Sequence, residues 1–137
     1  MSIEPGRARY VSLTTFRASG QGGSTPVWIA PTVAGLGEPG DLVVISELDT
    51  WKVKRLRKDS RVELRPCDMR GRVEADAPTW TGQGRIAAEP EDVRLVKRAI
   101  GDKYGWWYHA FAAVERVMVR VRPSYPARAG IIITLDS

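Results

Sequence analysis

Short apolar, β-branched runs separated by clusters of glycine and proline set the character of this sequence. The 137 residues include 13 glycines and 9 prolines, which cluster between the apolar runs. Glycine and proline mark turns, whereas β-branched and aromatic residues favour strands. The pattern therefore predicts many short strands joined by turns, in a single domain that covers residues 1–137.

Six segments have the composition of β-strands. They cover residues 10–16, 25–30, 41–46, 61–68, 79–88 and 131–135. Segment 41–46 is apolar almost throughout, which is typical of a strand buried on both faces. Pro26 lacks an amide hydrogen, so it belongs at the start of its strand or at a sheet edge. Mainly local connections between the strands predict a small closed barrel, mainly β and of the α+β class.

Helical spacing of apolar residues predicts a short helix over 51–58 and a helical pair over 90–103 and 107–118. Thr50 is a good N-cap for the first helix, because its hydroxyl can accept a hydrogen bond from a free amide. Val53 and Leu56 lie three residues apart and can face a core. The helical pair carries more apolar surface than one core needs, which predicts a homodimer.

The net charge of +5 is concentrated between residues 51 and 72. That segment holds nine lysines and arginines against three acidic residues, and Lys52 lies in the first turn of the predicted helix. Free backbone amides, the Thr50 hydroxyl and the Lys52 ammonium can converge there on one phosphate. The alternatives are a solvated basic helix without a ligand and a nucleic-acid surface. Aromatic residues do not alternate with the cations as in a stacking platform, so we expect no nucleic-acid partner.

Chemistry based on side chains alone has little support. Cys67 and His109 are the only cysteine and histidine. These counts exclude an internal disulfide and a Cys/His zinc site, and we assign no metal ligand and no catalytic residue. Demanding chemistry must then come from a bound cofactor. No apolar run is long enough to span a membrane and the N-terminus lacks the features of a signal peptide, so we expect a cytoplasmic protein without a membrane partner.

Several segments, in order, resemble one family. They are Arg9 to Arg17, Thr25-Pro26-Val27-Trp28, Trp51 to Arg57, Arg61-Val62, Pro66 to Val73 and Lys103-Tyr104-Gly105-Trp106. Together they are similar to the pyridoxamine 5'-phosphate oxidase-like split-barrel family, and within it to the B-type group of flavin/deazaflavin oxidoreductases. The resemblance covers nearly the whole chain.

The resemblance implies a six-stranded split β-barrel of the FMN-binding type that forms a homodimer, with cofactor sites at the subunit interface. The implied cofactor is coenzyme F420, with FMN as the second choice. The ring would lie along residues 25–28, and Ser46, Thr50 and Lys52 would hold the phosphate. The candidate cofactor-binding residues are Thr25, Pro26, Val27, Trp28, Ser46, Thr50, Trp51, Lys52, Val53 and Trp80.

One departure concerns Trp51, which stands where members of the family usually have glycine. Its ring either stacks on the cofactor or fills part of the cofactor's path, and stacking is favoured because Thr50 and Lys52 are both retained. The function expected is hydride transfer from reduced coenzyme F420 to a conjugated organic acceptor. The alternatives are an FMN-dependent oxidoreductase and a non-catalytic protein of the same fold that binds a flavin, tetrapyrrole or acyl ligand.

Overall fold

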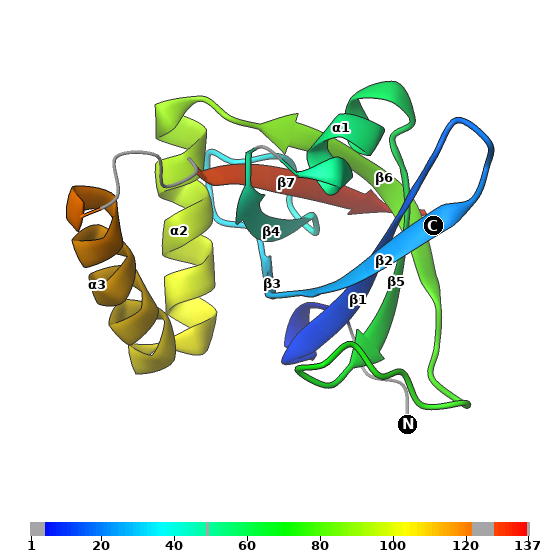
Figure 1. The fold of residues 1–137 in the computed structure, drawn as a ribbon, viewed down its shortest axis with the longest axis horizontal. Helices are drawn as coiled ribbons and strands as arrows, with labels where there is room; N and C mark the ends of the chain where they lie inside the picture. Colours follow the sequence, from blue (N-terminus) through cyan, green and yellow to red (C-terminus); the bar gives the residue numbers. More distant parts are fainter. Residues whose placement is uncertain (1–4, 49, 122–127, 137) are drawn as a thin grey trace.

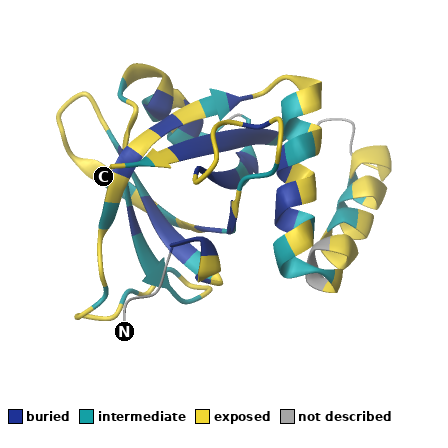
Figure 2. Cartoon of the chain, turned by 180° about the vertical axis from the view of Figure 1, so that it is seen from behind, coloured by how far each residue is buried: buried dark blue, intermediate teal, exposed yellow. Residues whose placement is uncertain are grey.

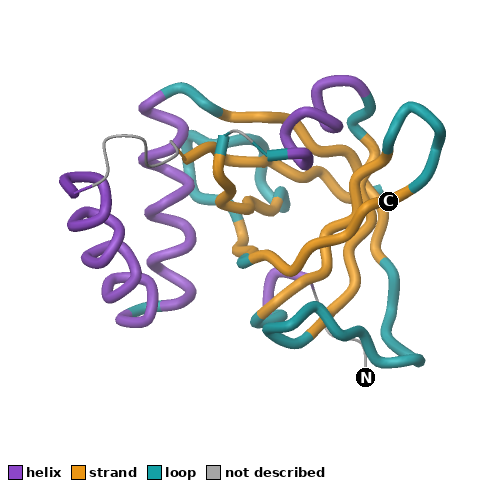
Figure 3. The backbone as a smooth tube through the Cα atoms, in the orientation of Figure 1, coloured by secondary structure: helices purple, strands orange, loops and turns teal. Residues whose placement is uncertain are grey.

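The computed structural model describes residues 5–48, 50–121 and 128–136. The chain forms a curled antiparallel sheet of seven strands, with one short helix over it and a pair of longer helices at one end (Figures 1 and 3). The elements in order are η1 (Pro5–Arg7), β1 (Tyr10–Phe16), β2 (Gly22–Val27), β3 (Ile29–Pro31), β4 (Leu42–Glu47), α1 (Trp51–Lys58), β5 (Arg61–Cys67), β6 (Trp80–Ala87), α2 (Pro90–Tyr104), α3 (Trp106–Val121) and β7 (Arg128–Leu135).

The sheet has the strand order β2-β1-β5-β6-β7-β4-β3, so β2 and β3 lie at its two opposite edges. A single residue, Trp28, joins these two edge strands along the chain. The backbone therefore bridges the edges of the curled sheet, and the prediction of a closed barrel is wrong, because β2 and β3 do not pair with each other. The six strands predicted from sequence become seven, because the predicted strand 25–30 divides at Trp28. Its first half pairs with β1, where Val27 lies opposite Val11, and its second half pairs with β4, where Ile29 lies opposite Val44.

Two apolar clusters lie on opposite faces of the sheet (Figure 2). The cluster inside the curl is built from alternate residues of most strands, such as Leu13, Leu64 and Ile131, with Leu56 from α1. The second cluster lies under α2, where Val96 and Ile100 pack with strand residues such as Val43 and Ile132. Strand β4 contributes to both clusters, which confirms the prediction that segment 41–46 is buried on both faces.

The helical pair predicted from sequence is confirmed, with a sharp break at Gly105. Gly105 has φ +62°, a conformation that glycine adopts without strain and that ends α2. Helix α2 lies directly against the sheet, since a Cβ atom at Gly130 of β7 would come within 2.4 Å of the Val96 side chain. Helix α3 lies on the outer side of α2 (Figure 1). Within the described part of the chain, no helix is both long and apolar enough to cross a membrane.

Candidate functional site

The first turn of α1 follows directly on the end of β4. Thr50 is the N-cap, as predicted, and its Oγ1 accepts a hydrogen bond from the Val53 amide at 3.4 Å. The Thr50 and Ser46 hydroxyls both donate to the Glu47 carbonyl, each at 3.2 Å. The end of the strand and the start of the helix are thereby tied together, and both hydroxyls are held beside the helix N-terminus, where backbone amides favour an anion.

Lys52 is half-buried in the same turn. Burial lowers the pKa of its ammonium, Glu47 partly opposes this shift, and the nearby Arg55 adds to it. None of the described acidic residues forms an ion pair with Lys52. A partly desolvated cation that none of the described acidic residues contacts directly favours the approach of an anionic ligand.

These residues face a cavity of about 580 Å³ that reaches from α1 to the edge strand β2. Six of the predicted cofactor-binding residues line it together: Pro26, Val27, Trp28, Ser46, Thr50 and Lys52. The structure therefore joins the strand predicted to carry a ring with the turn predicted to hold a phosphate. The other lining residues, which sequence reasoning did not identify, are Tyr10, Ile45, Glu47, Met69, Phe111 and Arg128.

Four predicted residues do not line this cavity, and their roles stay predictions. Val53 is fully buried in the core, and Trp80 at the start of β6 packs against the core cluster inside the curl. Thr25 precedes Pro26 on β2, with a buried hydroxyl that has no hydrogen-bond partner among the described residues. The side chain of Trp51 is 69% exposed and lines a different cavity.

An aromatic cluster forms the wall of the site around Trp28. Its indole stacks on Tyr104 of α2 with ring centroids 5.0 Å apart, and meets Phe111 of α3 edge-on at 5.4 Å. The guanidinium of Arg128 lies 5.5 Å from the Phe111 ring and pairs with Glu115 at 2.9 Å. These contacts bring residues from β7, α2 and α3 to one wall. The periodicity of the sequence does not predict these contacts, because the residues that meet are distant in sequence.

The end of α2 fastens the backbone just after Trp28 to the residues that precede β1. The Ile29 amide donates to the Tyr104 hydroxyl at 3.1 Å, and that hydroxyl donates to the Arg9 carbonyl at 2.7 Å. The Lys103 ammonium donates to the carbonyls of Ala8 and Ile29. Burial raises the pKa of Tyr104 to about 12 and lowers that of Lys103 to about 8.

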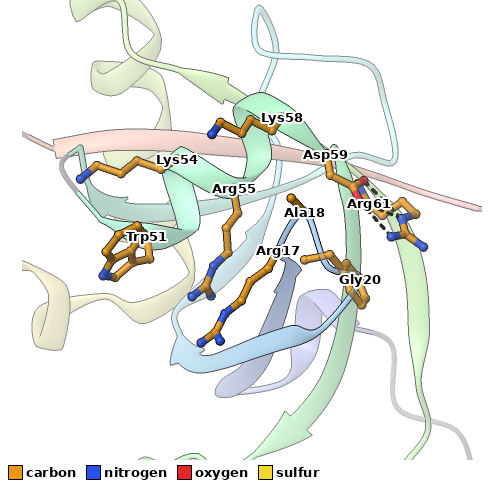
Figure 4. A pocket seen from close by; sticks show the side chains of 10 residues that line it. Arg17, Ala18, Gly20, Trp51, Lys54, Arg55, Lys58, Asp59 and Arg61 are labelled. Atoms are coloured by element: carbon orange, nitrogen blue, oxygen red, sulfur yellow. Dashed lines mark hydrogen bonds and ion pairs between the residues drawn. The ribbon is translucent and has the colours of Figure 1, made fainter.

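A second cavity of about 760 Å³ lies on the other side of α1 (Figure 4). Its cations come from the hairpin after β1, from α1 and from β5; they are Arg17, Lys54, Arg55, Lys58 and Arg61. The Lys54 ammonium lies 4.9 Å from the centre of the Trp51 ring, and Arg61 is paired with Asp59 at 2.9 Å. Gly23 leaves room for Arg55, because a Cβ atom there would come within 2.2 Å of its guanidinium. This cavity is strongly basic.

Groups that could support other chemistry lie elsewhere or are unreactive. Burial, reinforced by Asp68, raises the pKa of the Cys67 thiol, so its nucleophilic thiolate is disfavoured. His109 lines a separate cavity between α2 and α3. Within the described ranges, no three potential ligands among histidine, cysteine, aspartate and glutamate gather as they would around a metal ion.

Comparison with solved structures gives three informative matches. A conserved hypothetical protein from Mycobacterium tuberculosis is 22% identical with a TM-score of 0.63, and the match covers 96% of this chain and 76% of that chain. HutZ, a heme storage protein from Vibrio cholerae, is 9% identical with a TM-score of 0.62 over 100% and 92% of the two chains. An F420 reductase is 17% identical with a TM-score of 0.52 over 96% and 90%.

No protein-family model and no curated protein matches the chain. At these identities the structural matches establish the fold and not the ligand. The shared fold nevertheless covers nearly the whole of this chain in each of the three matches. The chain shares its fold with these proteins and with a putative pyridoxamine 5'-phosphate oxidase from Listeria innocua, which agrees with the fold that the sequence resemblance implies.

Proposed function

We propose that this protein is an oxidoreductase that uses reduced coenzyme F420 to transfer a hydride to a conjugated organic acceptor. One observation carries the proposal. The cavity of about 580 Å³ brings Pro26, Val27 and Trp28 together with Ser46, Thr50 and Lys52. A ligand with a planar ring and a phosphate needs both parts of this site. The apolar edge strand can bind the ring, and the helix N-terminus with its cation can bind the phosphate. The fold shared with an F420 reductase supports the same assignment.

The residues present fit such a cofactor. Ser46 and Thr50 provide hydroxyls, and Lys52 provides a cation that no described acidic residue pairs with directly. Strand β2 is an edge strand and ends at Val27, just before Trp28. A ring can therefore lie against the backbone of these two residues. The indole of Trp28 faces Tyr104 and Phe111, which fixes this wall of the cavity.

The basic cavity on the far side of α1 favours coenzyme F420 over FMN. The tail of coenzyme F420 carries several carboxylates beyond its phosphate, whereas FMN ends at the phosphate. Arg17, Lys54 and Lys58 line a second cavity that shares helix α1 with the cavity at Lys52, and they can bind those carboxylates. A phosphate alone leaves this second group of cations without a role.

When bound, the coenzyme supplies a hydride from its reduced ring. The chain's own residues hold and orient the ring, and Ile45, Met69 and Phe111 give the cavity an apolar wall. Protons reach the acceptor from solvent. We assign no catalytic side chain.

Two copies of the chain complete the site in this proposal. Met69 is 69% exposed and Phe111 37% exposed, although both line the cavity, so its outer side is open to solvent in one copy. A second copy would cover this side, and Trp80 is the candidate for contact with the partner's ring. A cytoplasmic, homodimeric enzyme with a small-molecule substrate is the resulting hypothesis.

The test is titration of the purified protein with coenzyme F420, FMN and heme, followed by absorbance and fluorescence. We expect the tightest binding with coenzyme F420 and oxidation of its reduced form when a conjugated carbonyl compound is added. Tight binding of FMN with turnover would identify the flavin variant. Binding without turnover on any acceptor would refute the enzymatic proposal.

A non-catalytic ligand-binding role is the second candidate, because the fold is also shared with a heme storage protein. Heme needs an axial ligand, and His109, the one histidine of the chain, lies at a different cavity. Tyr10 and Met69 are the residues of the main cavity that could serve instead. A heme spectrum that changes in Met69→Ala or Tyr10→Phe would support this candidate.

A further inference from the structure

A tight turn directly after β5 is closed by the side chain of Asp68. One carboxylate oxygen accepts hydrogen bonds from the amides of Arg70 and Arg72, both at 2.9 Å, and the other accepts one from Arg72 Nε at 2.7 Å. The Asp68 amide also donates to the Arg72 carbonyl, and the Gly71 amide donates to the Asp68 carbonyl. These bonds fix the path of residues 68–72, although none of them is buried.

The same turn is packed against the strand that is proposed to carry the cofactor ring. Gly71 lies on the ring of Pro26, because a Cβ atom at Gly71 would come within 3.4 Å of the Pro26 Cδ atom. The backbone of Gly71 has φ +86°, a conformation that glycine adopts without strain. The turn is thereby held in place relative to β2.

Of the residues in this turn, Met69 lines the ligand cavity. Its side chain is 69% exposed, so the backbone is fixed while the side chain can change rotamer. A methionine side chain is unbranched and polarisable, and it adapts to apolar ligands of different shape. Met69 is therefore suited to contact a ligand, whereas its exposure means that it adds little to the core of the fold.

The turn lies far from the part of the site that would hold the phosphate. Strand β5 begins just after α1 and ends at Cys67, so the turn lies at the opposite end of this strand from α1 (Figure 1). Lys52 of α1 and Met69 nevertheless line one cavity, together with Pro26 and Trp28. A ring bound at Pro26 with its phosphate at Lys52 leaves the end at Met69 for the acceptor.

We infer that Met69 is a specificity-determining contact for the acceptor and that Asp68 positions it. This role rests on the proposed function, because an acceptor is needed only if the protein transfers a hydride. The side chains of Met69, Trp28 and Phe111 are apolar or aromatic and line the same cavity. They favour an acceptor that carries an aromatic ring beside its conjugated double bond.

Oxidation by hydrogen peroxide, localised by mass spectrometry, tests the contact without the need for turnover. The peroxide gives one oxygen atom to a methionine sulfur and leaves as water. Met118 of α3 is half-buried and does not line the cavity, so it is the internal control. We expect Met69 to react faster than Met118, both in the free protein and in its complex with oxidised coenzyme F420.

Benzylideneacetone, a conjugated ketone with a phenyl ring, is the acceptor probe for this complex. At about four times its dissociation constant it should slow the oxidation of Met69 about fivefold, because about one fifth of the protein then stays unliganded. The oxidation of Met118 should not change.

Variants separate the contact from a structural effect. Met69→Ala should raise the KM for benzylideneacetone about fivefold at unchanged kcat, and the KM for the smaller cyclohexenone less than about twofold, because only the larger acceptor loses an apolar contact. Asp68→Ala should raise the same KM. Asp68→Asn retains an oxygen that can accept both amides, so it should restore most of the loss. The dissociation constant of coenzyme F420 should not change in any of these variants.

The possible outcomes distinguish this role from the proposed function. If reduced coenzyme F420 is consumed but benzylideneacetone does not slow the oxidation of Met69, the acceptor contact is overturned and the oxidoreductase stands. The contact is also overturned if the coenzyme alone slows this oxidation, or if Met69 reacts no faster than Met118 in the free protein. Equal rises of KM for both acceptors in Met69→Ala overturn the specificity role. If no acceptor consumes the reduced coenzyme, the oxidoreductase and the acceptor role both fall.

Discussion

The indole of Trp28 lies nearly parallel to the ring of Tyr104, with centroids 5.0 Å apart and planes inclined by 20°. This stack joins the residue that links the two sheet edges to the last turn of α2. The Tyr104 hydroxyl also binds the backbone of Ile29 and Arg9, so one side chain holds β3 and the start of β1 together. The position of Trp28 at the ligand cavity therefore depends on α2.

Tyr104→Phe tests the role of this hydroxyl. The change keeps the stack on Trp28 but leaves the amide of Ile29, a fully buried residue, without its acceptor. We expect a loss of ~1–3 kcal/mol in the free energy of unfolding, the usual effect of an unsatisfied buried group. Urea denaturation measures it, and Tyr104→Ala should lose more because the stack disappears as well. Equal stability of wild type and Tyr104→Phe would contradict the fastening role.

Lys103 should make stability depend on pH. Burial lowers the pKa of its ammonium from 10.5 to about 8. Between these values the unfolded chain binds more protons than the folded chain, so the free energy of unfolding rises as pH increases. Solvent screening of this partly exposed group limits the rise to about 1 kcal/mol. Urea denaturation at pH 7.5 and 9.5 should show the rise in wild type but not in Lys103→Met; the same slope in both would exclude Lys103 as its source.

Lys52→Ala should weaken cofactor binding by ~1.5–3 kcal/mol, the range for a charge-assisted hydrogen bond to phosphate. The loss should be similar for coenzyme F420 and FMN, because both carry the phosphate. Burial lowers the pKa of Lys52, so its ammonium loses its charge earlier as the pH rises. The affinity of the wild type should therefore begin to fall at a lower pH than it would with a lysine of ordinary pKa. Lys97→Ala, at the separate cavity between α2 and α3, is the control for a general charge effect, and equal losses in both variants would indicate a diffuse basic surface.

Cations of the second cavity should affect the binding of coenzyme F420 but not the binding of FMN. The double variant Arg17→Ala/Lys54→Ala removes two cations from the far side of α1 and leaves Lys52 in place. We expect affinity for coenzyme F420 to fall by ~1–2 kcal/mol while affinity for FMN stays within error, since only the longer ligand reaches these cations. Calorimetry with both ligands measures the difference. An equal loss for FMN would mean that the cavity does not bind the tail.

Local signals predicted the cap and the first turn of α1, and contacts between residues distant in sequence decided the rest. Thr50 and Lys52 could be identified because a cap and a first turn involve neighbours in sequence. The division at Trp28 could not, because it depends on which strands reach the two edges of the sheet. Phe111 and Arg128 join the cavity wall only because Phe111 of α3 contacts Trp28 and Arg128 of β7 lies over the Phe111 ring. The separation of Trp51 from Lys52 was foreseeable, since consecutive helix residues do not face the same side.

The side chain of Trp51 should contact the ligand at the second cavity. The sequence favoured stacking on the cofactor, and the structure places the exposed ring at the basic cavity across α1 from Lys52, with Lys54 against it. Contact there involves the tail of coenzyme F420, which is not aromatic, and not its ring system. Because the indole then covers apolar groups of the tail, Trp51→Gly should weaken the binding of coenzyme F420 by ~0.5–1 kcal/mol and leave the binding of FMN unchanged. Trp51→Ala, which retains better helix propensity at this first helical position, controls for fraying of α1. Fluorescence titration with both ligands gives the result, and tighter binding in either variant would show that the indole blocks the ligand.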